Sequence, residues 1–532
     1  MPAGPVPHAG VPGGTWVLLC GDLASSPAGI DPQAVARRLA AYMPSASVQV
    51  VPDLCTRTER TARHLTGRGS AAVLGLCRPM TSLAPLQAAM RRAGLDPLGV
   101  EIVALGLLAR AVPASLAVER AVILTAAAAA RVEAFSGSRP QHLRPVLPPA
   151  VSRRSLFALS WLEYQVVPAA RADRCRADAG CALCVLACPH QALEATGGEI
   201  RLLKLRCTSC AVCVTACPHD AMEFPGFTAA EMDARTRALL DPLISPLQPR
   251  AILLSCAGSP ALPALAGGIH PIPASWLPLE VPCAEMVPAR WLLAFLARGA
   301  AAVGVVPCPN GCRTGGPGRI EGRVAFCRQL LARMGESEPR ILTLPAEPAA
   351  LARVLRQPLP GPGPGDPALP GAFAAGAAAQ LLQHLARAYD AETVAVSHPF
   401  SPFGVLDVRD GCTLCGACAA VCPTGALALQ RDEDEILIVD PARCVACGQC
   451  LPACPEPDVL HLGQVADLGR LAAGRTEVRR SRQRRCAACG APIAPETMLQ
   501  RIGVLLGDQH ARARDVIARY CQDCRAASMS PI

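Results

Sequence analysis

Residues Cys412–Pro423, "CTLCGACAAVCP", hold four cysteines within eleven residues and end in a proline. A cubane iron–sulfur cluster needs four thiolates at tetrahedral corners, and Cys-x2-Cys-x2-Cys spacing lets one tight loop supply three of them. The fourth cysteine follows three residues later, before the proline, and points away from that loop toward a second cluster. The stretch therefore predicts one half of an interlocked pair of [4Fe–4S] clusters.

The motif recurs along the chain, so the sequence contains an internal repeat. Copies at 444–455 and 207–218 keep the spacing, whereas "CRADAGCALCVLACP" at 175–189 has five residues instead of two after its first cysteine. With the fourth ligand exchanged inside each pair, the predicted sets are Cys412, Cys415, Cys418 with Cys454; Cys444, Cys447, Cys450 with Cys422; Cys207, Cys210, Cys213 with Cys188; and Cys175, Cys181, Cys184 with Cys217. Two alternatives stay open: a three-iron cluster in the last set, and zinc, which usually takes two pairs of ligands rather than triplets.

The two cysteine-rich blocks, residues 165–228 and 400–465, resemble bacterial ferredoxin domains that carry two [4Fe–4S] clusters. The resemblance rests on the paired motifs, their Cys-Pro ends and the hairpin-like stretches "GGEIRLLKLR" and "DEILIVD" between them. It implies two ferredoxin-like dicluster domains with four [4Fe–4S] clusters in total.

Residues 245–350 have a different pattern, in which apolar runs typical of buried strands lead into cysteines. "RAILLS", "LPLEVP" and "AAVGVVP" precede Cys256, Cys283 and Cys308, and Cys312 follows. Helical stretches lie between these runs, which predicts a parallel α/β sheet. Ligands gather beyond the carboxyl ends of such strands, so the four cysteines are expected to converge.

This region resembles the delta subunit of methyl-viologen-reducing hydrogenase. The matching pieces are "LLSCAG", "EVPCAEMVP" and "VPCPNGCRTGG". The resemblance implies a [2Fe–2S] cluster on Cys256, Cys283, Cys308 and Cys312. It also implies electron transfer between a hydrogenase or formate dehydrogenase and a heterodisulfide reductase.

Residues 1–150 repeat the strand–cysteine pattern with Cys20, Cys55 and Cys77. The pieces "LLCGDL", "PDLCTRT" and "LGLCRPM" resemble the N-terminal α/β domain of heterodisulfide reductase A, which implies a further cluster at these three cysteines. The alternative is an α/β domain with three inert thiols.

The last segment, residues 480–532, contains the pairs "CAAC" and "CQDC". Two thiolate pairs favour a zinc-ribbon-like module with structural zinc, and a rubredoxin-like iron or another cluster is the alternative. The predicted zinc ligands are Cys486, Cys489, Cys521 and Cys524. A Pro/Gly-rich linker is expected at 355–376, because its composition disfavours both helix and strand.

Composition narrows the class of protein. The net charge of +9 counts 28 cysteines as neutral; bound clusters and zinc carry about −12 together and would leave about −3. Nucleic acid is therefore not the favoured partner. We expect a cytoplasmic protein, because no signal peptide or membrane span is visible and abundant thiols in a reducing compartment indicate metal ligation.

The sequence as a whole predicts a multidomain α/β plus α+β protein with two parallel-sheet α/β domains. It has no Ser/His/Asp set or nucleotide-binding glycine loop, so we predict no catalytic residue. The leading hypothesis is a multi-cluster electron-transfer subunit of a redox complex linked to a formate dehydrogenase or hydrogenase. The alternatives are an accessory protein that matures a redox enzyme, and a redox sensor that acts on nucleic acid through residues 479–532.

Overall fold

The computed structural model describes residues 14–26, 29–56, 71–77, 86–88, 90, 96–108, 114–137, 143–145, 162–164, 166–256, 259, 272–307, 319–366 and 369–529. These residues fall into two compact units. Unit 1 comprises Met1–Cys175 and Leu183–Tyr389, and unit 2 comprises Arg176–Ala182 and Asp390–Ile532. Within the described ranges, no helix combines the length and hydrophobicity needed to cross a membrane.

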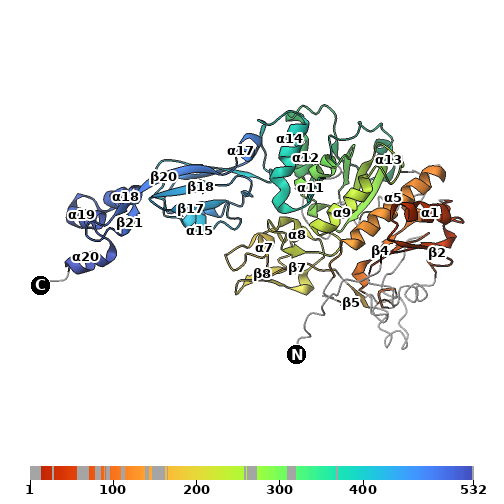
Figure 1. The fold of residues 1–532 in the computed structure, drawn as a ribbon, viewed down its shortest axis with the longest axis horizontal. Helices are drawn as coiled ribbons and strands as arrows, with labels where there is room; N and C mark the ends of the chain where they lie inside the picture. The colour runs from red at the N-terminus through yellow and green to blue at the C-terminus, as the bar shows by residue number, and fades with distance from the viewer. Residues whose placement is uncertain are drawn as a thin grey trace. The chain divides into compact units, whose positions relative to one another are not determined.

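The N-terminal part of unit 1 is a parallel four-stranded sheet in the order β2-β1-β3-β4. Its strands are β1 (Trp16–Cys20), β2 (Ser47–Val51), β3 (Ala72–Gly75) and β4 (Val100–Val103). Helices α1 (Pro32–Tyr42) and α5 (Ala114–Glu133) pack against the sheet (Figure 1). Helix α1 begins where the Asp31 carboxylate accepts a hydrogen bond from the Gln33 N–H and Pro32 occupies the first turn.

A second parallel sheet in unit 1 has the equivalent order, β12-β11-β13-β14. Its strands are β11 (Ala251–Cys256), β12 (Trp276–Val281), β13 (Val303–Val306) and β14 (Ile341–Thr343), and its helices are α11 (Ala289–Ala297), α12 (Arg319–Arg333) and α13 (Pro348–Leu355). The two predicted parallel α/β sheets are thus confirmed. In each sheet the first strand lies between the second and third, and Cys20 and Cys256 end these first strands. The strand order therefore reverses beside β1 and beside β11. Parallel sheets usually bind ligands at their carboxyl edge next to such a reversal.

Buried arginines hold the two sheets of unit 1 together. The Arg120 guanidinium on α5 is fully buried and donates to the main-chain carbonyls of Ile272 at 3.1 Å and Trp276 at 2.5 Å. Helix α9 (Ala229–Leu240) packs on α5, and its Asp233 pairs with the buried Arg298 after α11. Both α/β regions therefore share one packed interior.

Between α13 and the 3-10 helix at Ala375–Ala377, the described part of the predicted linker 355–376 is irregular, and it packs on the second sheet's helices. Phe373 is fully buried against the rings of Trp291 and Phe295, at centroid distances of 5.8 and 5.1 Å. At Gly365 a side chain would come within 2.1 Å of the Gly299 nitrogen, so only glycine fits this close approach. The segment continues into α14 (Ala378–Ala388), which packs on α11.

The first cysteine-rich block adds short elements to unit 1. They are β7 (Ala169–Ala170), α7 (Leu183–Ala187), the hairpin β8 (Leu193–Thr196) and β9 (Glu199–Leu202), α8 (Val212–Ala216) and β10 (Met222–Glu223). Strands β7 and β10 pair, which brings the two ends of the block together.

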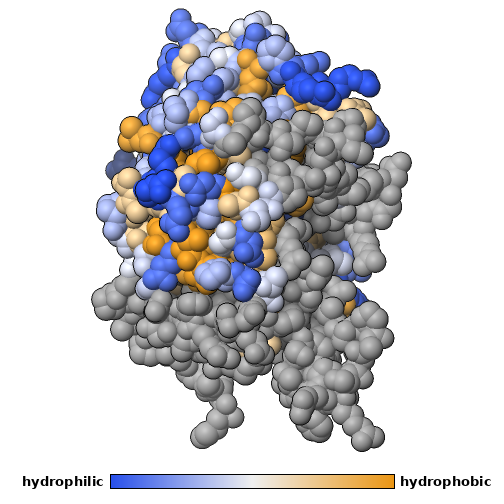
Figure 2. All heavy atoms as spheres, turned by 90° about the vertical axis from the view of Figure 1, so that its right-hand side faces the viewer, coloured by the Kyte–Doolittle hydropathy of each residue, from blue (hydrophilic) through white to orange (hydrophobic). Residues whose placement is uncertain are grey.

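On the face of the molecule drawn in Figure 2, hydrophobic residues form small patches between hydrophilic ones.

Unit 2 contains the second block between β16 (Gly404–Val408) and β19 (Leu460–Asp467), which pair antiparallel. Inside it lie α15 (Ala417–Ala420), the hairpin β17 (Leu427–Arg431) and β18 (Asp434–Val439), and α16 (Cys450–Ala453). The basic run at 479–485 is part of strand β20 (Thr476–Arg485), which pairs with β18. The C-terminal segment is therefore joined to the cysteine-rich block by a continuous sheet, completed by β21 (Pro492–Pro495).

The buried Arg120 generates a stability prediction. Replacing it (Arg120→Ala) leaves two buried carbonyls without their donors and creates a cavity, so we expect the free energy of unfolding to fall by about 3 kcal/mol. Urea unfolding followed by circular dichroism measures the change. The control is Arg37→Ala, because that side chain is 73% exposed and its ion pair with Asp31 spans 3.9 Å. Equal midpoints for the two variants would contradict the structural role of Arg120.

Candidate metal centres

The three regularly spaced cysteine loops share one backbone conformation. In each, the second and fourth residues after the first cysteine have positive φ: Leu414 and Gly416, Ala446 and Gly448, Ser209 and Ala211. Such left-handed residues turn successive main-chain N–H groups toward the inside of the loop, a concavity that suits an anionic iron–sulfur cluster. The left-handed conformation costs about 1 kcal/mol at a non-glycine residue. The rest of the loop must therefore hold the backbone in this strained conformation.

In unit 2 the cysteines surround two small apolar cavities of about 20 Å³ each. One is lined by Cys412, Cys415, Cys418 and Cys454, together with Leu429 and Leu437. The other is lined by Cys422, Cys444, Cys447 and Cys450. Each cavity thus has three cysteines from one motif and the fourth from the other, which is the grouping expected for exchanged ligands.

Burial controls the protonation of these thiols. Burial first, and neighbouring cysteines second, raise the pKa of Cys418 to about 12 and that of Cys450 to about 11. Both thiols are therefore protonated at neutral pH in the metal-free chain. Iron has to displace these protons, so binding of a cluster releases protons and stabilises the folded loops.

The first block brings one predicted set together. Cys188, Cys207, Cys210 and Cys213 line a small cavity of about 20 Å³. The sulfur of Cys188 accepts a hydrogen bond from the Ala192 N–H at 3.3 Å. Such bonds to ligand sulfurs are one of the factors that set a cluster's reduction potential.

The remaining set in this block is divided between the two units. Cys175, Cys184 and Cys217 belong to unit 1, whereas Cys181 lies in the short segment that groups with unit 2. The sulfur of Cys217 accepts a hydrogen bond from the Ala221 N–H at 3.3 Å, as Cys188 does from Ala192. The assignment of all four ligand sets to clusters stays a prediction.

Two of the four cysteines expected at the second parallel sheet are described. Cys256 ends β11, and Cys283 follows β12 and is fully buried. The Cys256 thiol donates to the carbonyl of Pro282 at 3.7 Å, so the two cysteines lie at the same sheet edge. Cys308 and Cys312 lie outside the described residues.

Cys283 also packs against the first cysteine-rich block. It forms one apolar cluster with Cys210 and Val212, and Ala187 packs on this cluster. Arg290, seven residues after Cys283, donates to the Thr215 carbonyl at 3.1 Å. Members of two predicted ligand sets are therefore direct neighbours inside unit 1.

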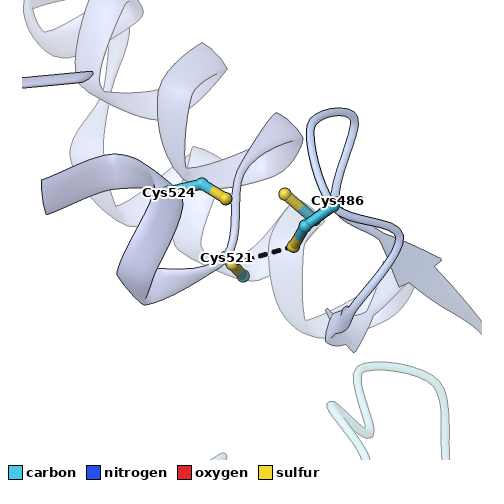
Figure 3. A group of neighbouring side chains, drawn as sticks. Cys486, Cys521 and Cys524 are labelled. Atoms are coloured by element: carbon cyan, nitrogen blue, oxygen red, sulfur yellow. Dashed lines mark hydrogen bonds between the residues drawn. The ribbon is translucent and has the colours of Figure 1, made fainter. Parts of the chain in front are cut away.

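The four C-terminal cysteines converge, as predicted. Cys486, Cys489, Cys521 and Cys524 have all their sulfurs within 4.8 Å of one another. Figure 3 shows Cys486, Cys521 and Cys524 directed toward a common centre, and the Cys489 and Cys521 sulfurs are 3.6 Å apart. Hydrogen bonds from main-chain N–H groups of Cys521 and Cys489 lower the pKa of Cys486 to about 6, which provides a thiolate at neutral pH.

The N-terminal sheet also gathers its cysteines at one edge. Cys20 and Cys77 are 3.9 Å apart between sulfurs, and Cys77 and Cys55 are 2.8 Å apart. The Asp22 carboxylate joins them, with all four ligand atoms within 4.8 Å. Reasoning from cysteines alone missed Asp22, although its place two residues after Cys20 at the same strand end is visible in the sequence.

Comparison with known proteins supports three regions of the chain. Residues 411–457 match the model of the 4Fe-4S dicluster domain, residues 204–228 that of a 4Fe-4S binding domain, and residues 258–357 that of the methyl-viologen-reducing hydrogenase delta subunit. The predicted resemblances to ferredoxins and to the delta subunit are confirmed. The resemblance to heterodisulfide reductase A stays a prediction.

Similar curated proteins share short segments with the chain. One component of the Na(+)-translocating ferredoxin:NAD(+) oxidoreductase complex of Acetobacterium woodii is 46% identical over 48 residues, which are 9% of this chain and 14% of that protein. The thiosulfate reductase electron transfer subunit PhsB of Salmonella typhi is 48% identical over 50 residues, 9% of this chain and 25% of that protein. The chain thus spans a quarter or less of these two relatives.

A small relative is matched almost completely. A ferredoxin-like protein in the nif region of Rhizobium leguminosarum bv. trifolii is 38% identical over 57 residues, 10% of this chain and 84% of that protein. In this chain, the grouping of cysteines from two motifs around each cavity is a feature expected of a ferredoxin with two clusters. Through its 4Fe-4S dicluster domain, the chain belongs to the ferredoxin family.

Proposed function

We propose that this chain is a multi-cluster electron-transfer subunit of a cytoplasmic redox complex. The observation that carries the proposal is the packing of Cys283 against Cys210. It brings a predicted ligand of the delta-subunit-like region beside a predicted ligand of the first ferredoxin-like block. Neighbouring clusters at these positions would let an electron pass from one to the other within unit 1.

The proposed cofactors follow the ligand groups. Four [4Fe–4S] clusters would be bound by the two cysteine-rich blocks, a [2Fe–2S] cluster by Cys256, Cys283, Cys308 and Cys312, and zinc by the C-terminal cysteines. Main-chain N–H groups in the cysteine loops would stabilise the reduced, more negative clusters. The domain boundaries stated from the sequence are part of the same proposal, as is a relationship of residues 1–150 to heterodisulfide reductase A.

The proposed partner is a formate dehydrogenase or a hydrogenase whose catalytic centre lies on another chain. The match of residues 258–357 to a hydrogenase delta subunit supports this choice. The thiosulfate reductase protein is itself named an electron transfer subunit, which supports the same role for a dicluster domain in a larger complex.

An accessory role in maturing a redox enzyme is the second candidate. The observation that favours it is the C-terminal four-cysteine group, which electron transfer does not require. In this case the module would bind the client enzyme. Because β20 belongs to the sheet of the second cysteine-rich block, deletion from residue 475 would damage both parts. Point variants such as Cys489→Ser with Cys524→Ser change only the four-cysteine group. They therefore separate the accessory role from the electron-transfer role.

The exchanged ligands give a prediction about iron content. Cys412→Ala combined with Cys454→Ala should lose only about four irons per chain, because both residues would bind one cluster. The matched control, Cys412→Ala with Cys422→Ala, should lose about eight irons, because these residues would bind different clusters. Iron and acid-labile sulfide are measured on anaerobically prepared protein. The reverse order of the two losses would show that each motif binds its own cluster.

Arg290 provides a prediction about reduction potential. Its guanidinium interacts electrostatically with Cys217, and burial lowers its pKa to about 10, so it remains charged at neutral pH. A positive charge stabilises the reduced cluster, so Arg290→Gln should shift one cluster's potential negatively by about 60 mV, a tenfold change in the one-electron equilibrium.

The measurement for Arg290 is a redox titration followed by electron paramagnetic resonance. Arg290→Lys keeps the charge and should keep most of the potential. A shift of the same size in both variants would assign the effect to packing rather than to charge.

The proposed function is tested by anaerobic reduction of the purified chain with formate and a formate dehydrogenase, or with hydrogen and a hydrogenase. Catalytic amounts of one enzyme should bleach the visible iron–sulfur absorption. Cys283→Ala should slow onward transfer to an acceptor at least tenfold. Cys327→Ala is the matched control, because this buried thiol on α12 donates only to the Ala289 carbonyl among the bonds described. A chain that neither enzyme reduces, but that a client needs for maturation, would favour the accessory role.

A further inference from the structure

The four donors at the N-terminal sheet come from three successive strand ends. Cys20 ends β1, Asp22 lies in the turn that follows, Cys55 lies beyond β2, and Cys77 lies two residues beyond β3. Because β1 lies between β2 and β3, the three strands deliver these side chains to one point of the sheet's carboxyl edge. Three sulfurs and one carboxylate oxygen thus meet although they are far apart in the sequence.

The spacing of these donors corresponds to that around a single tetrahedral ion. A zinc–sulfur bond of about 2.3 Å places two ligand sulfurs about 3.8 Å apart, and a sulfur and an oxygen about 3.6 Å apart. The Cys20 and Cys77 sulfurs are 3.9 Å apart, and the Asp22 oxygen is 3.8 Å from the Cys20 sulfur and 4.0 Å from that of Cys55. Of these four distances, only that of 2.8 Å between the Cys55 and Cys77 sulfurs would have to lengthen, by about 1 Å.

The cysteines predicted to bind cubanes are arranged differently. Among described residues, three or more cysteine, histidine or acidic donors lie within 4.8 Å of one another only here and in the C-terminal group. The ferredoxin-like sets instead line small cavities, and the sulfurs of each set do not all lie within 4.8 Å of one another. A cubane separates its ligands by its own metal–sulfide core, whereas the N-terminal donors leave room for one ion.

The surrounding backbone holds the donors in place. Gly106 lies so close to Cys77 that a side chain there would come within 1.9 Å of the Cys77 carbonyl oxygen. Asp53 has φ +57°, and its carbonyl accepts hydrogen bonds from both the N–H and the hydroxyl of Thr56, which fixes the turn carrying Cys55. The Cys20 side chain is fully buried. These contacts preorganise the group without any disulfide, since all three cysteines are free.

We propose that Cys20, Asp22, Cys55 and Cys77 bind a single thiophilic divalent ion, zinc or ferrous iron, rather than an iron–sulfur cluster. Three thiolates exclude magnesium and calcium, which prefer oxygen ligands, and a complete set of four protein ligands is typical of a closed site. This site does not depend on the proposed electron-transfer function.

The test compares metal content in the full chain after anaerobic preparation. Iron, zinc and acid-labile sulfide are measured in the wild type and in Cys55→Ala. The proposal expects the variant to lose about one metal ion and no sulfide, and the element that is lost identifies the ion. Loss of about four irons with four sulfides would overturn the proposal in favour of a cubane. An unchanged content would overturn it in favour of inert thiols.

The role of Asp22 is tested separately. Asp22→Ala should release this ion to a chelator at least tenfold faster than the wild type does, and Asp22→Cys should restore retention by supplying a fourth thiolate. Asp53→Asn is the matched control, because it removes a neighbouring carboxylate outside the donor group. In every variant the remaining iron and sulfide report that the ferredoxin-like blocks are intact. Equal release from Asp22→Ala and Asp53→Asn would remove Asp22 from the ligand set.

Discussion

A loop can present three thiolates to one cluster but not the fourth, and this geometric limit shapes the cysteine-rich parts of the protein. In the proposed ligand sets the chain returns with a second loop, and each loop supplies the missing cysteine for the other. In unit 2 the hairpin of β17 and β18 connects the two cysteine loops. Cys454 of the second loop therefore lines the same cavity as Cys412 of the first. Burial keeps several of these thiols protonated without metal, so cluster binding and completion of the fold are coupled.

Unit 1 places a ferredoxin-like block and two α/β sheets around a common interior. Fully buried arginines contribute to this packing, because one guanidinium can donate to several carbonyls at once. Arg120 reaches from α5 to the strand β12, and Arg250 bonds the carbonyls of Leu239, Asp241, Ser245 and Leu247. The same packing brings Cys283 to Cys210, which is the contact on which the proposed electron path depends.

The two α/β sheets have the same strand order and carry cysteines at equivalent strand ends, yet their chemistry need not be the same. At the first sheet an aspartate follows the cysteine of the central strand, and three sulfurs and one carboxylate come close together. At the second sheet the described cysteines lie beside a ferredoxin-like loop. A shared architecture thus supports different sites, because side chains at the carboxyl edge decide what is bound.

The cysteine loops, the two parallel sheets and the grouping of the C-terminal cysteines could be predicted from the sequence, because cysteine spacing and strand periodicity are local properties. The sequence did not reveal Asp22 as a donor, the path of 479–485 along β18, or the packing of the Pro/Gly-rich segment around Phe373. These depend on which distant elements meet. An isolated basic run, glycine-rich stretch or aspartate has no local signal for its eventual neighbour. Only the tertiary structure, where buried polar groups must find partners and close approaches admit only glycine, decided these placements.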